Sequence, residues 1–262
     1  MNIGYICSMY SAYQLFLFNL RLMERIPFSG AIRRLCHPTH ENLARNVFGI
    51  DFNGPVGLGA GIDKDGRYYN SFSDYGFSFV ITGPSDTQGI RKTIDNIKSE
   101  RPHTVIVPCI SKDHPAAFSL AYDFADMFII DAPDDEIKNA LASVLDTRLA
   151  FDIQKPVLLR LGHEFSDATL KDILDFCLIN GVDGFLVGSE EYVKKVNELC
   201  KGRVPIIGYG KIRTPEAAEN MLKAGASLLA ITTGMLLDGP SLITRILKHL
   251  DRNESQKTGN NP

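Results

Sequence analysis

Two glycine-containing segments near the carboxyl end of the sequence have the composition of a phosphate-binding site. Gly208-Tyr209-Gly210-Lys211 and Thr232-Thr233-Gly234 each follow a short apolar segment. Glycine lets backbone N–H groups approach an oxyanion, and the N-terminus of a following helix adds partial positive charge. We therefore predict that these segments bind a small phosphate-bearing ligand. The alternative is that the glycines only permit tight turns.

Charged residues follow several other apolar segments. Asp131 stands at the end of such a segment and is a candidate for proton transfer. Further charges follow similar segments at Asp63, Lys64, Lys112 and Arg160. The acidic groups Asp134, Asp135, Glu136, Glu190 and Glu191 are instead expected in the first turns of helices, where acidic side chains complement the helix dipole without a catalytic role.

The cysteine, histidine and serine residues do not form a recognisable catalytic motif. Cys109 could act as a nucleophile only if a neighbour such as Lys112 lowered its pKa, because a buried thiol is usually inert. His163 and Glu164 fall in an expected solvated loop, and no Ser-His-Asp arrangement can be assembled. The five cysteines are odd in number and lack CxxC spacing, so we expect neither a disulfide framework nor a metal site. This cysteine content fits a protein of a reducing compartment.

The elements that must position these residues form a repeating pattern from Gly54 onward. Each repeat has an apolar segment rich in Val, Ile and Leu, then a turn, then an amphipathic stretch of helical length. The predicted strands are Val56–Gly59, Phe79–Thr82, Thr104–Cys109, Met127–Asp131, Val157–Leu161, Gly184–Val187, Pro205–Gly208 and Leu228–Thr232. Helices are predicted to begin near Lys64, Gly89, Pro115, Asp134, Asp167, Glu190, Pro215 and Pro240.

Eight such pairs predict an α/β fold, a (β/α)8 TIM barrel, in preference to an open doubly wound sheet. In this barrel the loops after the strands carry the chemistry. The spacing of Gly57, Gly59 and Gly61 matches a dinucleotide fingerprint poorly, and the end of a barrel strand explains it better.

Composition is that of one ordinary globular domain, with 262 residues, 44% apolar and 23% charged. The net charge of −3 argues against nucleic acid as a partner. We expect an N-terminal helical extension over residues 1–45, a barrel over 46–251 and a disordered tail over 252–262.

Polar residues interrupt the apolar segment Ile6–Met23, so it is a poor membrane span. We expect it to form a helix that packs on the protein's own core, a partner protein or a bilayer surface, followed by a short helix around Gly30–Cys36. The protein is accordingly expected in the cytoplasm, either free or peripheral on the inner membrane.

Two segments resemble a known family. Val47 to Gly66 (VFGIDFNGPVGLGAGIDKDG) is similar to the start of the barrel in class 2, membrane-associated, FMN-dependent dihydroorotate dehydrogenases, which are oxidoreductases of pyrimidine biosynthesis. Pro205 to Pro240 (PIIGYGKIRTPEAAENMLKAGASLLAITTGMLLDGP) resembles its end. The resemblance runs from the first expected helix to about Leu250, and it implies FMN as cofactor and a quinone-admitting N-terminal domain.

The resemblance also implies roles for individual residues. Lys64 matches a substrate-binding lysine, and Arg160 stands where a lysine holds the electron-rich edge of the flavin. Lys211 replaces the second of two consecutive phosphate-binding glycines. The predicted cofactor-binding residues are Gly59, Ala60, Gly61, Arg160, Gly208, Gly210, Lys211, Thr232, Thr233 and Gly234.

Departures from the family pattern fall on its catalytic residues. Asp131-Ala132-Pro133-Asp134 replaces a Ser-Ser-Pro-Asn segment, so Ala132 stands at the place of the serine base. Only Pro84 to Gln88 remain of an insertion that carries paired asparagines, Cys109 replaces a flavin-facing asparagine, and Val187 and Gly188 replace a threonine and an asparagine. Loss of a general base costs about 10²–10⁴ in rate.

Three hypotheses follow. The first is a diverged homologue that is inactive on dihydroorotate but still binds FMN or another phosphate-bearing ligand. The second is an active FMN oxidoreductase for another substrate, with Asp131 or Cys109 transferring the proton. The third is a non-catalytic protein that binds a partner or a membrane surface through its N-terminal helices.

Overall fold

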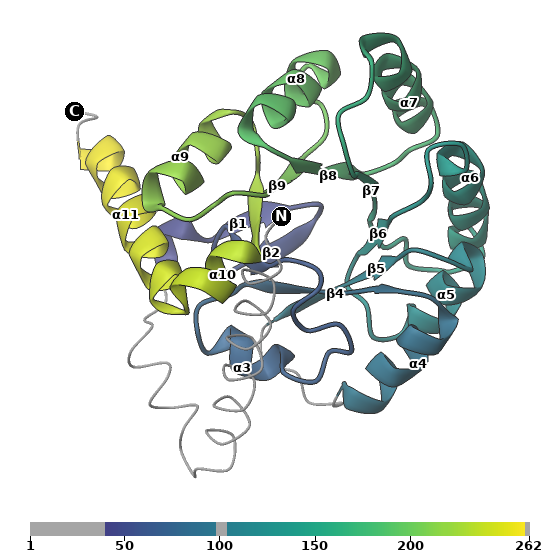
Figure 1. Cartoon of the computed structure of the whole chain (residues 1–262), viewed down its shortest axis with the longest axis horizontal. Helices are drawn as coiled ribbons and strands as arrows, with labels where there is room; N and C mark the ends of the chain where they lie inside the picture. Colours follow the sequence, from purple (N-terminus) through teal and green to yellow (C-terminus); the bar gives the residue numbers. More distant parts are fainter. Residues whose placement is uncertain (1–39, 98–103, 260–262) are drawn as a thin grey trace, which may run out of the picture.

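The computed structural model describes residues 40–97 and 104–259, and a closed barrel of eight parallel strands forms its centre (Figure 1). The strand order around the barrel is β10-β3-β4-β5-β6-β7-β8-β9. The strands are β3 (Val56–Leu58), β4 (Phe79–Ser85), β5 (Val105–Ile110), β6 (Phe128–Ile130), β7 (Val157–Leu161), β8 (Gly184–Gly188), β9 (Ile206–Tyr209) and β10 (Leu228–Ile231). The fold is therefore a (β/α)8 TIM barrel, and all eight predicted strands are confirmed.

Helices surround the barrel on the outside (Figure 1). They are α3 (Tyr69–Ser73), α4 (Thr87–Asn96), α5 (His114–Ala121), α6 (Ile137–Arg148), α7 (Asp167–Ile179), α8 (Glu190–Cys200), α9 (Pro215–Lys223), α10 (Thr233–Asp238) and α11 (Ser241–Gly259). Side-chain caps fix where four of them begin, since Asp86, Ser166, Ser189 and Thr214 each accept a hydrogen bond from a first-turn N–H group. Within the described ranges, no helix has both the length and the apolarity needed to cross a membrane.

Two apolar layers hold the barrel together. Inside it, alternate strand residues such as Ile81, Val107 and Leu158 form one buried cluster. Outside, the other strand residues pack against the helices in a second cluster. The interior layer is tightly filled, because a Cβ atom on Gly57 would lie 2.3 Å from the Phe79 ring.

An antiparallel hairpin precedes the barrel and was not predicted. After the short 3-10 helix η1 (Glu41–Leu43), strands β1 (Arg45–Val47) and β2 (Ile50–Phe52) pair through a two-residue turn. Phe48 and Gly49 in that turn both have positive φ, at 58° and 75°, which suits a tight hairpin. Val47 and Phe52 belong to the interior cluster, so the hairpin contributes to the barrel's interior packing.

Two predicted helix starts are wrong. No helix begins near Lys64: the carboxylate of Asp63 accepts hydrogen bonds from the N–H groups of Arg67 and Tyr68 and holds a loop there, and α3 follows it. α6 begins at Ile137, so Asp134 and Asp135 precede the helix and Glu136 is its N-cap. Glu190 and Glu191 do occupy the first turn of α8, as predicted.

The tail predicted to be disordered from residue 252 is helical as far as Gly259. α11 packs on the barrel through Ile243, Ile246 and Leu250. Its Asp251 binds His40 at 2.9 Å and Asn42 at 3.1 Å, so tertiary contacts extend the helix. The two helices predicted within residues 1–39 lie outside the described residues.

Candidate functional site

Two cavities open where the barrel strands end at their carboxyl termini. The first, which we call the glycine-lined cavity, has a volume of about 340 Å³. Its lining residues are Gly59, Ala60, Ile81, Pro84, Arg160, Leu186, Tyr209, Gly210, Lys211, Ile212, Ala230, Ile231, Thr232, Thr233 and Gly234. Eight of the ten predicted cofactor-binding residues are therefore brought together there.

Gly61 and Gly208 do not line this cavity. Gly208 faces outward, and a Cβ atom there would lie 2.6 Å from Cγ of Met221 on α9. Alternation along β9 explains this, because its neighbours Ile207 and Tyr209 pack with the interior cluster and the residue between them must face the other side. Gly61 instead donates its N–H to the carbonyl of Gly83 at 3.0 Å.

Polar groups form part of the lining of the glycine-lined cavity. Thr232 and Thr233 bring hydroxyl groups and Lys211 an ammonium group. α10 begins at Thr233, and the first N–H groups of a helix have no partner within it. Gly234 also has a packing role, because a Cβ atom there would lie 2.3 Å from the carbonyl oxygen of Ile212. These donors in the cavity lining can bind an oxyanion.

Arg160 and Asp131 form an ion pair beside the same cavity. The register of β6 and β7 pairs Ile130 with Leu159, which places the next residues of each strand side by side. Nη1 of Arg160 lies 2.5 Å from Oδ2 of Asp131. Burial alone would lower the pKa of Arg160, but Asp131 and Tyr209 outweigh it and raise that pKa. The guanidinium therefore stays charged and is bonded to the carboxylate that we considered as a proton acceptor.

The position of Cys109 argues against its role as a nucleophile or base. Its side chain is fully buried in the barrel interior. Burial, and then the charge of Asp131, raise the pKa of the thiol to about 12, although Arg160 acts in the opposite direction. Lys112, the neighbour proposed to activate it, lies outside the barrel interior and lines the larger of the two cavities. At neutral pH the thiol is protonated and unreactive.

The remaining polar candidates lie outside the glycine-lined cavity. His163 pairs with Asp134 at 3.2 Å, and both side chains are more than half exposed, as expected for a solvated loop. Ala132, at the place of the family's serine, carries no hydroxyl group. Within residues 40–97 and 104–259, no cluster of His, Cys, Asp and Glu has the geometry to hold a metal ion.

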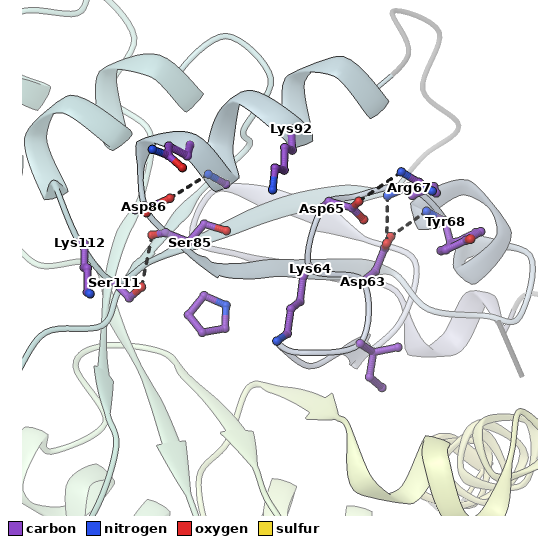
Figure 2. A pocket seen from close by; sticks show the side chains of 14 residues that line it. Asp63, Lys64, Asp65, Arg67, Tyr68, Ser85, Asp86, Lys92, Ser111 and Lys112 are labelled. Carbon is purple, nitrogen blue, oxygen red and sulfur yellow. Dashed lines mark hydrogen bonds and ion pairs between the residues drawn. The ribbon is translucent and has the colours of Figure 1, made fainter. Parts of the chain in front are cut away.

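The second cavity, which we call the basic cavity, is larger, at about 710 Å³ (Figure 2). It is lined by Ile62, Asp63, Lys64, Asp65, Arg67, Tyr68, Pro84, Ser85, Asp86, Gln88, Gly89, Lys92, Ser111 and Lys112. Pro84 is the one lining residue that the two cavities share. Lys64, predicted to bind substrate beside the flavin residues, thus lies in a cavity separate from them.

Several residues that line the cavities were not predicted from the sequence. Tyr209 and Leu186 line the glycine-lined cavity, and Ser85 and Lys92 line the basic one. Alternation along the strand that ends at Tyr209 could have identified that residue as inward-facing. No local signal marks Lys92, because only the packing of α4 on the barrel places it near the strand ends.

Known proteins match this chain over most of its length. A family model described as dihydroorotate dehydrogenase matches residues 187–253. Dihydroorotate dehydrogenase (quinone) of Christiangramia forsetii is 25% identical over 283 residues, covering 78% of this chain and 83% of that protein. The protein of the same name from Xanthobacter autotrophicus is 25% identical over 311 residues, covering 86% and 87%.

A solved structure shares the fold. The crystal structure of DHODH from Eimeria tenella in complex with ferulenol superposes with a TM-score of 0.72 and 19% sequence identity. The superposition covers 85% of this chain and 86% of that one. The superposition shows a shared fold, and the family-model match and the relatives that span most of both lengths show that this chain is similar to dihydroorotate dehydrogenases.

Proposed function

We propose that this protein binds FMN, or a ligand of the same phosphate-bearing class, in the glycine-lined cavity and does not oxidise dihydroorotate. The observation that carries the proposal is the contrast between the two parts of the site. Lys211, Thr232 and Thr233 supply donors in the cavity lining, whereas Ala132 stands at the place of the base. The ligand-binding part is kept and the proton-accepting part is lost.

The lining of the cavity fits such a ligand. Its volume of about 340 Å³ is within the range of small-molecule sites, roughly 300–1,000 Å³. Lys211, the two threonine hydroxyls and the first N–H groups of α10 would hold the phosphate. Ile81, Leu186 and Ala230 offer an apolar wall to a planar ring. A bound FMN supplies the two-electron oxidant in the chemistry of this family.

The fit is weaker at the electron-rich edge of the flavin. The family lysine is a compact cation, whereas Arg160 is a planar guanidinium that is bonded to Asp131. It would have to share its N–H groups between the carboxylate and the ligand. We therefore expect FMN to bind less tightly here than it does in a family member that has the lysine.

Of the residues that were candidates for proton transfer, Asp131 and Cys109 do not replace the lost base. Ala132 has no atom that accepts a proton. Oδ2 of Asp131 is occupied by Arg160, and the pKa of Cys109 is raised to about 12. An absent general base costs about 10²–10⁴ in rate, and the missing amide donors reduce substrate binding further. The geometry therefore gives no support to proton transfer by Asp131 or Cys109 for another substrate.

The test is to purify the full chain, add FMN, remove the free flavin and record the visible spectrum and the FMN content. We expect stoichiometric flavin and no reduction by dihydroorotate. Lys211→Gln should weaken FMN binding, whereas Lys194→Gln, on the exposed side of α8, should not. A protein that cannot be loaded with FMN contradicts the binding part of the proposal, and turnover of dihydroorotate contradicts the other part.

Ala132→Ser provides a second test, because it restores the family's side chain at the place of the base. We expect turnover to stay undetectable, since the amide donors of the family are still missing. A hundredfold rise in turnover would mean that the base alone was lost. Ala150→Ser, after the end of α6, is the matched control.

A further inference from the structure

We infer that the basic cavity is a second ligand site, which binds a small phosphate monoester. This inference does not rest on the proposed function, because the two cavities have different walls and share only Pro84. Four cationic side chains line the basic cavity: Lys64 after β3, Arg67 in the following loop, Lys92 on α4 and Lys112 after β5.

The acidic groups of the cavity already have partners in its walls. The carboxylate of Asp63 accepts hydrogen bonds from the N–H groups of Arg67 and Tyr68, at 2.9 and 3.0 Å. Asp86 accepts one from the N–H group of Gly89 at 2.8 Å and caps α4, and Asp65 pairs with the Arg67 guanidinium at 3.6 Å. These carboxylates hold the loops together.

The lysines, in contrast, have no such partners. Among residues 40–97 and 104–259, no ion pair or hydrogen bond involves the ammonium groups of Lys64, Lys92 or Lys112. Lys112 acts on Asp86 only through its charge at longer range. The three ammonium groups come from three elements that meet at the carboxyl end of the barrel (Figure 2). Lysine is a frequent phosphate ligand because it is a compact, fully charged donor.

A largely buried serine side chain in the cavity wall points independently to a ligand. Ser85 is 9% exposed, and its hydroxyl has no hydrogen-bond partner in the described part of the chain, although its carbonyl accepts the N–H of Ser111. Figure 2 shows this side chain directed toward the space between Lys92 and Lys64. Because Ser85 lines the cavity, its hydroxyl can donate a hydrogen bond to a ligand there. A ligand oxygen in the cavity would accept that hydrogen bond.

The first turn of α4 makes room for this hydroxyl. A Cβ atom on Gly89 would lie 2.7 Å from Oγ of Ser85, so a larger residue at position 89 would displace the serine side chain. Gln88 and Gly89 themselves line the cavity, so the positive end of the dipole of α4 adds to the charge of the lysines. Ser85, the lysines and this helix end thus surround one space.

Size and chemistry select the class of ligand. Several point charges and a helix N-terminus suit a phosphate dianion better than a single carboxylate. At about 710 Å³ the cavity holds more than one phosphate group, and Ser85, Ser111 and Gln88 give its walls hydrogen-bonding groups. We therefore expect a phosphate monoester with a small polar body.

The experiment is a calorimetric titration of the full chain at low ionic strength with glycerol 3-phosphate, inorganic phosphate and succinate as separate probes. We expect saturable binding of the two phosphate probes to the basic cavity that weakens as salt is added. Lys92→Ala/Lys112→Ala should reduce the affinity at least tenfold. The matched pair Lys194→Ala/Lys248→Ala removes two exposed lysines elsewhere and should leave it unchanged.

Further variants separate the two cavities. Ser85→Ala should weaken binding several-fold, and Ser119→Ala, exposed on α5, should not. Lys211→Gln, in the glycine-lined cavity, should not affect glycerol 3-phosphate, and Lys92→Ala/Lys112→Ala should not affect FMN. Failure of FMN to bind would therefore not contradict the inferred phosphate site in the basic cavity.

Three results would overturn the inference. They are an absence of saturable binding of either phosphate probe, equal weakening by the control pair of lysines, and tighter binding of succinate than of both phosphate probes. Circular dichroism of each variant confirms that the barrel is folded, so that lost affinity can be assigned to the cavity.

Discussion

The guanidinium of Arg160 and the carboxylate of Asp131 lie 2.5 Å apart, on adjacent strand ends, at the wall of the glycine-lined cavity. This pair links two departures from the family pattern, since Arg160 stands at the place of a lysine and Asp131 within the altered segment that follows β6. Each residue limits what the other can do. Asp131 holds a hydrogen-bond donor of Arg160 that could otherwise bind a ligand, and Arg160 holds the carboxylate oxygen that could otherwise accept a proton.

Asp131→Asn should release Arg160 for a ligand in this cavity. We expect FMN to bind several-fold more tightly, because a charged guanidinium that loses its anionic partner becomes available to the ligand. The free energy of unfolding should fall by only about 1 kcal/mol, since the two side chains are 32% and 23% exposed. Fluorescence titration with FMN and urea unfolding measure these effects.

The control for this variant is Asp134→Asn, which breaks the exposed pair between Asp134 and His163. It should change neither FMN affinity nor stability measurably. If both variants changed FMN affinity equally, the effect would come from net charge and not from Arg160.

Cys109 should resist alkylation in the folded protein. Its thiol is buried, and its pKa is raised to about 12, so almost none of the reactive thiolate is present at neutral pH. Brief treatment with iodoacetamide, followed by peptide mass spectrometry, should find Cys109 unmodified in the native state and modified in urea. Rapid native labelling of Cys109 would contradict the arrangement described here.

Glu219 should make the protein sensitive to acid. Hydrogen bonds from Lys223 and then from His249 lower the pKa of Glu219 from 4.5 to about 2. Because the folded value is the lower one, this carboxylate stabilises the fold above pH 4.5, and its contribution is lost as the pH falls toward 2. Solvent screens the pair with Lys223, whose side chain is 69% exposed, so the stabilisation is small.

Glu219→Gln tests this expectation. It should reduce stability modestly at neutral pH and flatten the loss of stability between pH 4.5 and 2, as followed by urea unfolding in a series of buffers. Glu198→Gln, exposed on α8, is the control and should leave the acid profile unchanged. Identical profiles for all three proteins would exclude the role of Glu219 in joining α9 to α11.

Gly57→Ala should destabilise the barrel by about 1–3 kcal/mol. The added methyl group would lie 2.3 Å from the ring of Phe79, which fills the interior of the barrel next to Phe52. Gly162→Ala is the matched control, because no heavy atom outside its immediate chain neighbours lies within 4 Å of the added Cβ atom. Thermal unfolding should separate the two variants, and equal midpoints would show that Phe79 can move aside.

The sequence by itself determined the barrel. Eight apolar segments separated by amphipathic stretches indicate buried parallel strands covered by helices. A strand that is buried on both faces has an almost continuous apolar sequence and no polar alternation. The same pattern identified the strand ends that line the cavities, and the glycine segments identified most of the glycine-lined one. Alternation along β9 also implies that Gly208 faces away from the barrel interior, toward α9.

Tertiary structure alone decided the rest, because it depends on residues that are distant in sequence. Contacts of Asp251 with His40 and Asn42 join α11 to η1, although the final residues appear disordered when read in isolation. The register of β6 and β7 brings Asp131 to Arg160, and the packing of α4 brings Lys92 toward Lys64 and Lys112. Local sequence fixes which face of an element a residue occupies, whereas closure of the barrel fixes which charges meet.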